Sequence, residues 1–193
     1  MLTGDIVLNC ESADDTKRLI NVLMNIFDSR NIPVAVTFGN HDSEQGAMSR
    51  EELMAYYNTF SCSLSVDDGE ALSGCGTYNI PVYSSKDSND IVFNCWLFDS
   101  GSNDETGAYD HVKQDQLDWY KAKSAELKAA NGGEVVPSLA FQHIIVPEIY
   151  DVLEKTDKKG LFTFEHRYND GEYYRFDPEQ DNHGILTETP CCG

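Results

Sequence analysis

Short apolar runs alternate along the chain with longer segments in which apolar residues recur at helical spacing. The apolar runs predict strands, and the segments with a repeat of 3.6 residues predict amphipathic helices. The expected strands cover 5–8, 34–38, 77–83, 91–98 and 135–141. The expected helices cover 14–29, 50–60, 115–130 and 147–154, with Leu117, Tyr120 and Leu127 as the buried positions of the third.

Capping residues support two of these helices. Ser12 precedes the first helix, where a serine side chain accepts a hydrogen bond from a free backbone N–H. Ser49 is followed three residues later by Glu52, which is the capping-box pattern. Because strands and helices alternate, the sequence predicts an α/β fold class with βαβ units, and the length of 193 residues fits a single domain over 1–193.

The chain is strongly acidic, with a formal net charge of −19. A basic face is needed to bind nucleic acid through phosphates, and anionic membranes repel an acidic surface, so neither partner is expected. The charge does fit binding of metal cations. No secretory leader follows Met1, no stretch reaches the length of a spanning helix, and the compartment is left open.

The six cysteines form no CxxC pair, which disfavours a zinc ribbon. Cys191 and Cys192 are adjacent, a poor arrangement for an ordinary loop-closing disulfide. Cys62 and Cys75 flank a polar loop and could pair in an oxidising compartment, which their spacing alone does not decide. The alternative is that these cysteines are mostly buried thiols.

Candidate chemistry lies where three of the expected strands meet their loops. Asp5 belongs to a Gly-Asp pair at a strand edge, the run Gly39-Asn40-His41-Asp42 follows the strand 34–38, and His143 follows the strand 135–141. Open α/β sheets gather their ligands at such strand ends. Carboxylate, amide and imidazole groups together suit a borderline transition metal. Taken alone, the run 39–42 also fits a tight turn with a helix cap.

The order and spacing of these motifs resemble the calcineurin-like metallophosphoesterases. The resemblance is carried by Thr3-Gly4-Asp5-Ile6-Val7, the strand and turn over 33–42, the helix beginning at Gln116, and the histidine motif over 140–148. It is closest to the branch related to purple acid phosphatases. It implies an α/β/β/α sandwich, incomplete at both ends in this chain.

The resemblance also implies roles for individual residues. Asp5 matches the carboxylate that bridges two metal ions, and Asn40 and His143 match ligands of one of them. His41 matches a histidine that is not a ligand but protonates the leaving alkoxide or stabilises charge near the phosphate. Asp42 would orient that histidine or the turn. The family uses two divalent or trivalent metal ions, for which iron, manganese and zinc all suit these ligands.

Two motifs of the family have no match here, the Asp-x-His of the first strand and the final Gly-His-x-His. His166 and His183 are expected to be surface or tail residues rather than replacement ligands. We therefore expect an internal piece of a longer phosphoesterase that binds metal weakly or not at all by itself. Its substrate would be a small-molecule or protein phosphoester, and exposed sheet edges would favour self-association.

Two other interpretations fit the same sequence. One is a non-catalytic binding module on a degenerate phosphoesterase scaffold, which the missing motifs equally allow. The acidic segment 99–105 suggests a calcium-binding surface protein, although it lacks the spacing of an EF-hand.

Overall fold

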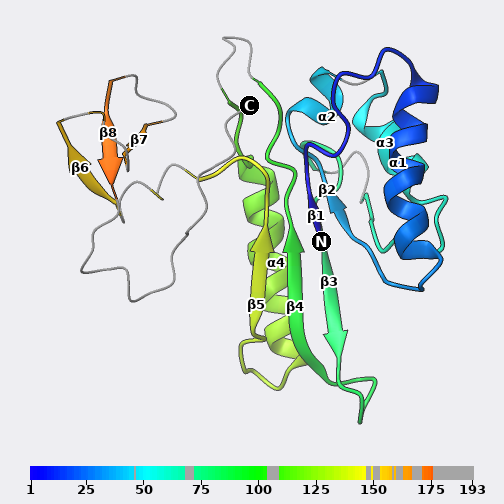
Figure 1. The fold of residues 1–193 in the computed structure, drawn as a ribbon. Coiled ribbons are helices and arrows are strands. Elements are labelled where there is room, and N and C mark those ends of the chain that lie inside the picture. Colours follow the sequence, from blue (N-terminus) through cyan, green and yellow to red (C-terminus); the bar gives the residue numbers. More distant parts are fainter. Residues whose placement is uncertain are drawn as a thin grey trace. The chain divides into compact units, whose positions relative to one another are not determined.

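The computed structural model divides the chain into two compact units, Met1–Ile144 and Ile145–Gly193. Together the described parts have a mixed α/β architecture with several small sheets, so the predicted α/β class is confirmed (Figure 1). The prediction of one domain over 1–193 stays a prediction. The residues that the structure describes are 1–45, 47–67, 72–103, 109–146, 149, 153–157, 159, 163–166 and 171–175.

The first unit begins with a βαβ arrangement. β1 (Leu2–Thr3) pairs in parallel with β2 (Val36–Thr37), and α1 (Ala13–Asp28) connects them. The Ser12 side chain accepts a hydrogen bond from the backbone N–H of Asp15, so the predicted cap of α1 is confirmed. This connection brings the loops that follow β1 and β2 to the same end of the small sheet.

The strand predicted over 5–8 is wrong, because the strand lies earlier, at β1. The backbone N–H groups of Asp5, Ile6 and Val7 do not join a sheet and instead donate to the carboxylate of Asp42. The apolar run reflects burial of Val7 in the core rather than strand pairing.

Two helices follow β2. α2 (His41–Glu44) is a single turn directly after the strand, and α3 (Arg50–Tyr57) begins with the predicted capping box of Ser49 and Glu52. The expected helix 50–60 is therefore confirmed but ends about one turn early. Its early end leaves 58–67 as irregular chain that returns to pair with Val34 through an isolated bridge at Ser63.

The second sheet has the strand order β3-β4-β5. β3 (Tyr78–Tyr83) and β4 (Ile91–Leu97) form the predicted antiparallel hairpin, and β5 (Ser138–Phe141) pairs with β4 in parallel. α4 (Gln114–Ala130) makes the connection from β4 to β5 and lies behind this sheet in Figure 1.

The contact between α4 and the sheet is aromatic. Trp119 and Tyr120 pack edge-on against Trp96 and Phe98, with ring centroids 4.8–6.4 Å apart. The predicted burial of Leu117 is wrong, since this residue is 40% exposed. The helix is rotated so that Gln116, the residue before it, is buried and donates to the Asp99 carbonyl and the Thr77 hydroxyl.

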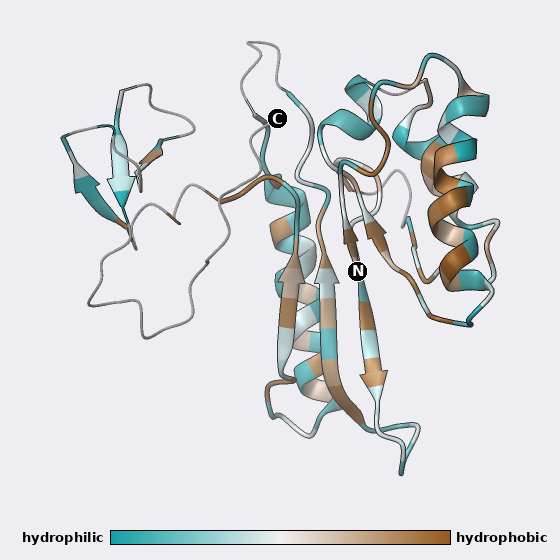
Figure 2. Ribbon diagram, in the orientation of Figure 1, coloured by the Kyte–Doolittle hydropathy of each residue, from teal (hydrophilic) through white to brown (hydrophobic). Residues whose placement is uncertain are grey.

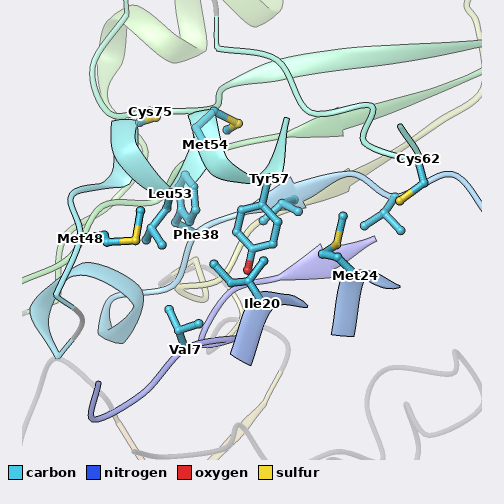
Figure 3. Packing of buried hydrophobic residues seen from close by; sticks show 12 residues of the cluster. Val7, Ile20, Met24, Phe38, Met48, Leu53, Met54, Tyr57, Cys62 and Cys75 are labelled. Carbon is cyan, nitrogen blue, oxygen red and sulfur yellow. The ribbon is translucent and has the colours of Figure 1, made fainter. Parts of the chain in front are cut away.

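The main core fills the space between β1, β2, α1 and α3. Figure 3 shows its side chains, including Ile20 and Met24 from α1, Leu53 and Tyr57 from α3 and Phe38 after β2. The four cysteines among the described residues are free thiols. Cys62 and Cys75 lie at opposite ends of this cluster in Figure 3, so the disulfide between them that the sequence left open is not formed.

Apolar residues are not confined to this core. Figure 2 shows brown turns along much of α1, and Val22 and Ile26 of this helix are 66% and 50% exposed. Among the described residues, none of the helices has both the length and the apolar character needed to cross a membrane.

The second unit contains a three-stranded antiparallel sheet in the order β6-β8-β7. Its strands are β6 (Glu154–Thr156), β7 (Phe164–Glu165) and β8 (Tyr173–Arg175). Arg175 and Glu154 form an ion pair across two of these strands. Most of the helix expected over 147–154, together with His183, Cys191 and Cys192, lies outside the described residues.

Candidate functional site

The loops that follow β1, β2 and β5 bring three of the predicted residues together, two through their side chains and one through its backbone. The Nε2 atom of His143 lies 3.3 Å from Oδ2 of Asp5. The other carboxylate oxygen of Asp5, Oδ1, accepts a hydrogen bond of 3.1 Å from the backbone N–H of His41. Residues that are 138 positions apart in the sequence thus meet at one point, and both facing side chains are partly exposed.

The orientation of the His143 ring is set by a backbone carbonyl. Its Nδ1 lies 2.9 Å from the carbonyl oxygen of Thr3, which only accepts, so Nδ1 carries a hydrogen and donates. In the neutral ring the lone pair is then on Nε2, which faces Asp5. An imidazole whose second nitrogen donates to a carbonyl is the usual arrangement of a metal-binding histidine.

Two glycines make this close approach sterically possible. A Cβ atom on Gly39 would lie 2.1 Å from Oδ1 of Asp5, and one on Gly4 would lie 2.8 Å from Nδ1 of His143. Gly4 also has a φ of +97°, a backbone angle that residues with a Cβ atom rarely adopt. Asp5 itself has a φ of 54°, so the turn between β1 and the site holds two successive left-handed residues.

The buried carboxylate of Asp42 joins the turn after β1 to the turn after β2. Its carboxylate accepts hydrogen bonds of 2.7–3.1 Å from the backbone N–H groups of Asp5, Ile6, Val7 and Gly39. The residue is 1% exposed, and this burial raises the pKa of its carboxyl while the four N–H donors act in the opposite direction. Its carboxylate therefore binds backbone and leaves the side chain of His41 to other partners.

Asn40 and His41 lie on the first turn after β2. The amide nitrogen of Asn40 contacts Glu44 and the Nδ1 atom of His41, both at 3.3 Å. The amide nitrogen of Gln45 lies 2.9 Å from the same Nδ1 atom of His41. Since both amide nitrogens are donors, Nδ1 acts as the acceptor and the proton of the neutral His41 ring is on Nε2.

The structure brings two of the three predicted metal ligands, Asp5 and His143, into direct contact. They offer an oxygen and a nitrogen, whereas the amide nitrogen of Asn40, on the neighbouring turn, contacts Glu44 and His41. Within the described residues, no group of three or more His, Cys, Asp or Glu side chains is arranged to hold a metal ion. His166 belongs to the second unit, where its ring packs against Tyr174.

The sequence interpretation missed a buried ion pair behind the site. Arg50 binds Asp99, and these side chains are only 10% and 0% exposed. Both also line a polar cavity of about 720 Å³ together with Ser43, Ser102 and Lys113. In the sequence, Arg50 is only the residue after the helix cap Ser49, and Asp99 is only one acid of the segment 99–105. Asp99 of the segment 99–105 is thus already paired, and Asp104 and Glu105 lie outside the described residues.

Sequence comparison finds distant relatives among curated proteins. A protein of Arabidopsis thaliana named probable inactive purple acid phosphatase 29 is 28% identical over 177 residues, which are 83% of this chain and 45% of that protein. Phosphatase DCR2 of Saccharomyces cerevisiae is 27% identical over 165 residues, which are 81% of this chain and 28% of its own length.

An uncharacterized protein of Schizosaccharomyces pombe is 30% identical over 128 residues, which are 66% of this chain and 24% of that protein. The chain therefore spans less than half the length of each of these relatives. No protein-family model matches the chain, and no solved structure matches it significantly.

Proposed function

We propose that this chain is part of a metal-dependent phosphoesterase of the calcineurin-like superfamily, in the branch related to purple acid phosphatases. The observation that carries the proposal is the pairing of His143 Nε2 with Asp5 Oδ2 at 3.3 Å, with Nδ1 of the histidine donating to a carbonyl. A carboxylate oxygen and an imidazole lone pair attract each other only when a proton or a metal cation lies between them. The names of two distant relatives support a phosphatase-like activity.

Asp5, Asn40 and His143 would hold the metal. For Asn40 this uses the amide oxygen, since its nitrogen is engaged with Glu44 and His41. When bound, such ions supply Lewis-acid activation of a water and charge neutralisation of the phosphate. The turn over 39–42 and the loop after β1 set the direction of these ligands, and the buried Asp42 keeps the two segments in register.

His41 supplies the proton for the leaving oxygen. Its Nδ1 accepts from Gln45, so the transferable proton is on Nε2. An alkoxide leaving group needs such a donor, because proton transfer from a placed acid lowers the barrier to its departure. Asp42 positions the turn that carries His41 and does not itself take part in proton transfer.

A metal titration tests the proposal with the 193-residue chain. We expect Mn²⁺ to bind weakly, with the affinity at least tenfold lower in Asp5→Asn and His143→Ala than in the unmodified chain. His166→Ala is the matched control and should leave the affinity unchanged. Mn²⁺ binding that is indifferent to both site substitutions, or no binding at millimolar Mn²⁺ by a chain extended to the length of its relatives, would overturn the metal site.

A non-catalytic binding module on the same scaffold is the second candidate, favoured by the word inactive in the name of the relative from Arabidopsis thaliana. Turnover of p-nitrophenyl phosphate with Mn²⁺ separates the two candidates. Slower turnover in His41→Ala with unchanged Mn²⁺ affinity supports the phosphoesterase. Site-specific Mn²⁺ binding without any turnover, in a chain extended to the length of its relatives, supports the binding module.

A further inference from the structure

Arg50 contacts five polar groups next to the site. Its Nη2 atom lies 2.9 Å from the carbonyl oxygen of Gly39, 2.8 Å from that of Gly101 and 2.7 Å from the hydroxyl of Ser102. Its Nε atom lies 3.2 Å from the hydroxyl of Ser43, and its Nη1 atom donates to Asp99. The guanidinium group thus joins the turn after β2 to the loop after β4.

The Gly39 contact is the one that reaches the site. Gly39 precedes Asn40 and His41, and its own N–H donates to Asp42, so the guanidinium fixes the other side of the same peptide segment. The Ser43 contact holds the far end of that turn. The segment that bears Asn40 and His41 is therefore held between Asp42 on one side and Arg50 on the other.

The loop after β4 carries the connection onward to His143. Asp99 accepts from the backbone N–H groups of Gly101 and Cys75 as well as from Arg50, which fixes the loop over 99–102. The hydroxyl of Ser100, within this loop, accepts a hydrogen bond of 2.9 Å from the backbone N–H of Ile144. Ile144 directly follows His143. Hydrogen bonds and the backbone of the loop 99–102 therefore connect Arg50 to the segment that bears His143.

The chemistry of this network favours arginine over any other cation. One planar group serves five acceptors on two segments, and its charge is neutralised by a fully buried carboxylate. A lysine would keep the charge beside Asp99 but brings one nitrogen where arginine brings three, so it cannot serve all five acceptors. Capping of α3 does not explain these contacts, because Ser49 and Glu52 already form the capping box at the start of this helix.

We propose that Arg50, anchored by Asp99, is a positioning residue that sets the turn bearing Asn40 and His41 against the loop supporting His143. Only the effect that we expect on Mn²⁺ binding rests on the proposed function. The positioning itself concerns the described residues of the first unit.

Hydrogen exchange of the full chain measures the positioning directly. In Arg50→Lys we expect amide exchange in 39–43, in 99–102 and at Ile144 to become at least tenfold faster, with α1 unchanged. Asp99→Asn should give the same pattern. Arg18→Lys is the control, because Arg18 pairs with Asp15 on the exposed surface of α1. Unchanged exchange in these segments, or a uniform rise across the whole first unit, would overturn the proposal.

Mn²⁺ affinity adds a readout that a merely structural role would not change. Measured where circular dichroism shows the fold intact, the affinity should fall at least tenfold in Arg50→Lys and not in Arg18→Lys. Equal affinity in Arg50→Lys and the unmodified chain would contradict positioning of the metal ligands. If the unmodified chain binds no Mn²⁺, the exchange experiment alone decides the role of Arg50, and the proposed function is decided by Mn²⁺ binding of a chain extended to the length of its relatives.

Discussion

Asp42 and Asp5 belong to adjoining turns, but their carboxylates have opposite surroundings. Asp42 is 1% exposed and accepts four backbone N–H groups, whereas the Asp5 side chain is 31% exposed and faces the imidazole of His143. The carboxylate oxygens of Asp42 are occupied by backbone N–H groups. The carboxylate of Asp5 retains an oxygen directed at another side chain and at solvent.

This difference separates the residue that builds the site from the residue that can act in it. A buried carboxylate surrounded by backbone donors has no position left for a ligand. Its removal leaves those buried N–H groups without an acceptor. A half-exposed carboxylate opposite an oriented imidazole contributes little to folding and is accessible to a cation. The sequence interpretation expected Asp42 to orient His41 or the turn, and the four backbone N–H groups on its carboxylate favour the turn.

The largest effect is expected from removing the Asp42 carboxylate. In Asp42→Ala four backbone N–H groups lose their acceptor, and we expect a loss of more than about 3 kcal/mol in the free energy of unfolding. Asp5→Asn, measured in the same way by urea denaturation, should cost less than about 1 kcal/mol, since its carboxylate is partly solvated. Similar losses in the two variants would remove the distinction between the two regions.

Gly39→Ala tests how closely the two turns must approach. The new Cβ atom would lie 2.1 Å from Oδ1 and 2.6 Å from the backbone nitrogen of Asp5, so the turns must move apart. We expect a loss of up to about 3 kcal/mol, which is typical of overpacking in a tight site.

Gly132→Ala, at the end of α4, is the matched control. Its φ is +65° and no heavy atom lies within 4 Å of the added Cβ, so only the backbone penalty of about 1 kcal/mol is expected. A larger loss for Gly132→Ala than for Gly39→Ala in urea denaturation would show that close packing of the turns is unimportant.

The smallest effect concerns Asp28, a less buried counterpart of Asp42. The hydroxyl of Ser61 and the backbone N–H of Cys62 donate to its carboxylate, and these bonds lower its pKa below the ordinary value of 3.8. A carboxylate with a lowered pKa in the folded state stabilises the fold above pH 3.8, and this contribution is lost as the pH falls through the folded-state pKa.

Asp28→Asn should therefore show a slightly weaker decrease of stability than the unmodified chain when the pH is lowered from about 5 to 3. Urea midpoints at several pH values measure the difference, with Asp14→Asn on the exposed first turn of α1 as the control. An identical pH profile in Asp28→Asn and the unmodified chain would contradict the assignment.

Much of the fold follows from local sequence. Helical spacing and the capping residues Ser12 and Ser49 located α1 and α3, because these signals act within one or two turns of chain. The hairpin of β3 and β4 was equally accessible from its apolar runs. The run 39–42 marked the turn after β2 as chemically special, and the choice of Asp5 and His143 came from the motif order.

The tertiary structure decided what the local sequence could not. Whether the run over 5–8 forms a strand depends on the Asp42 carboxylate 35 residues away, and the rotation of α4 depends on Trp96 and Phe98 in another element. The pairing of Asp5 with His143 and the connections of Arg50 to Gly39 and Asp99 join loops that only meet in the folded chain. Periodicity and capping report neighbours along the chain, whereas the partners of a buried charge are set by packing between distant segments.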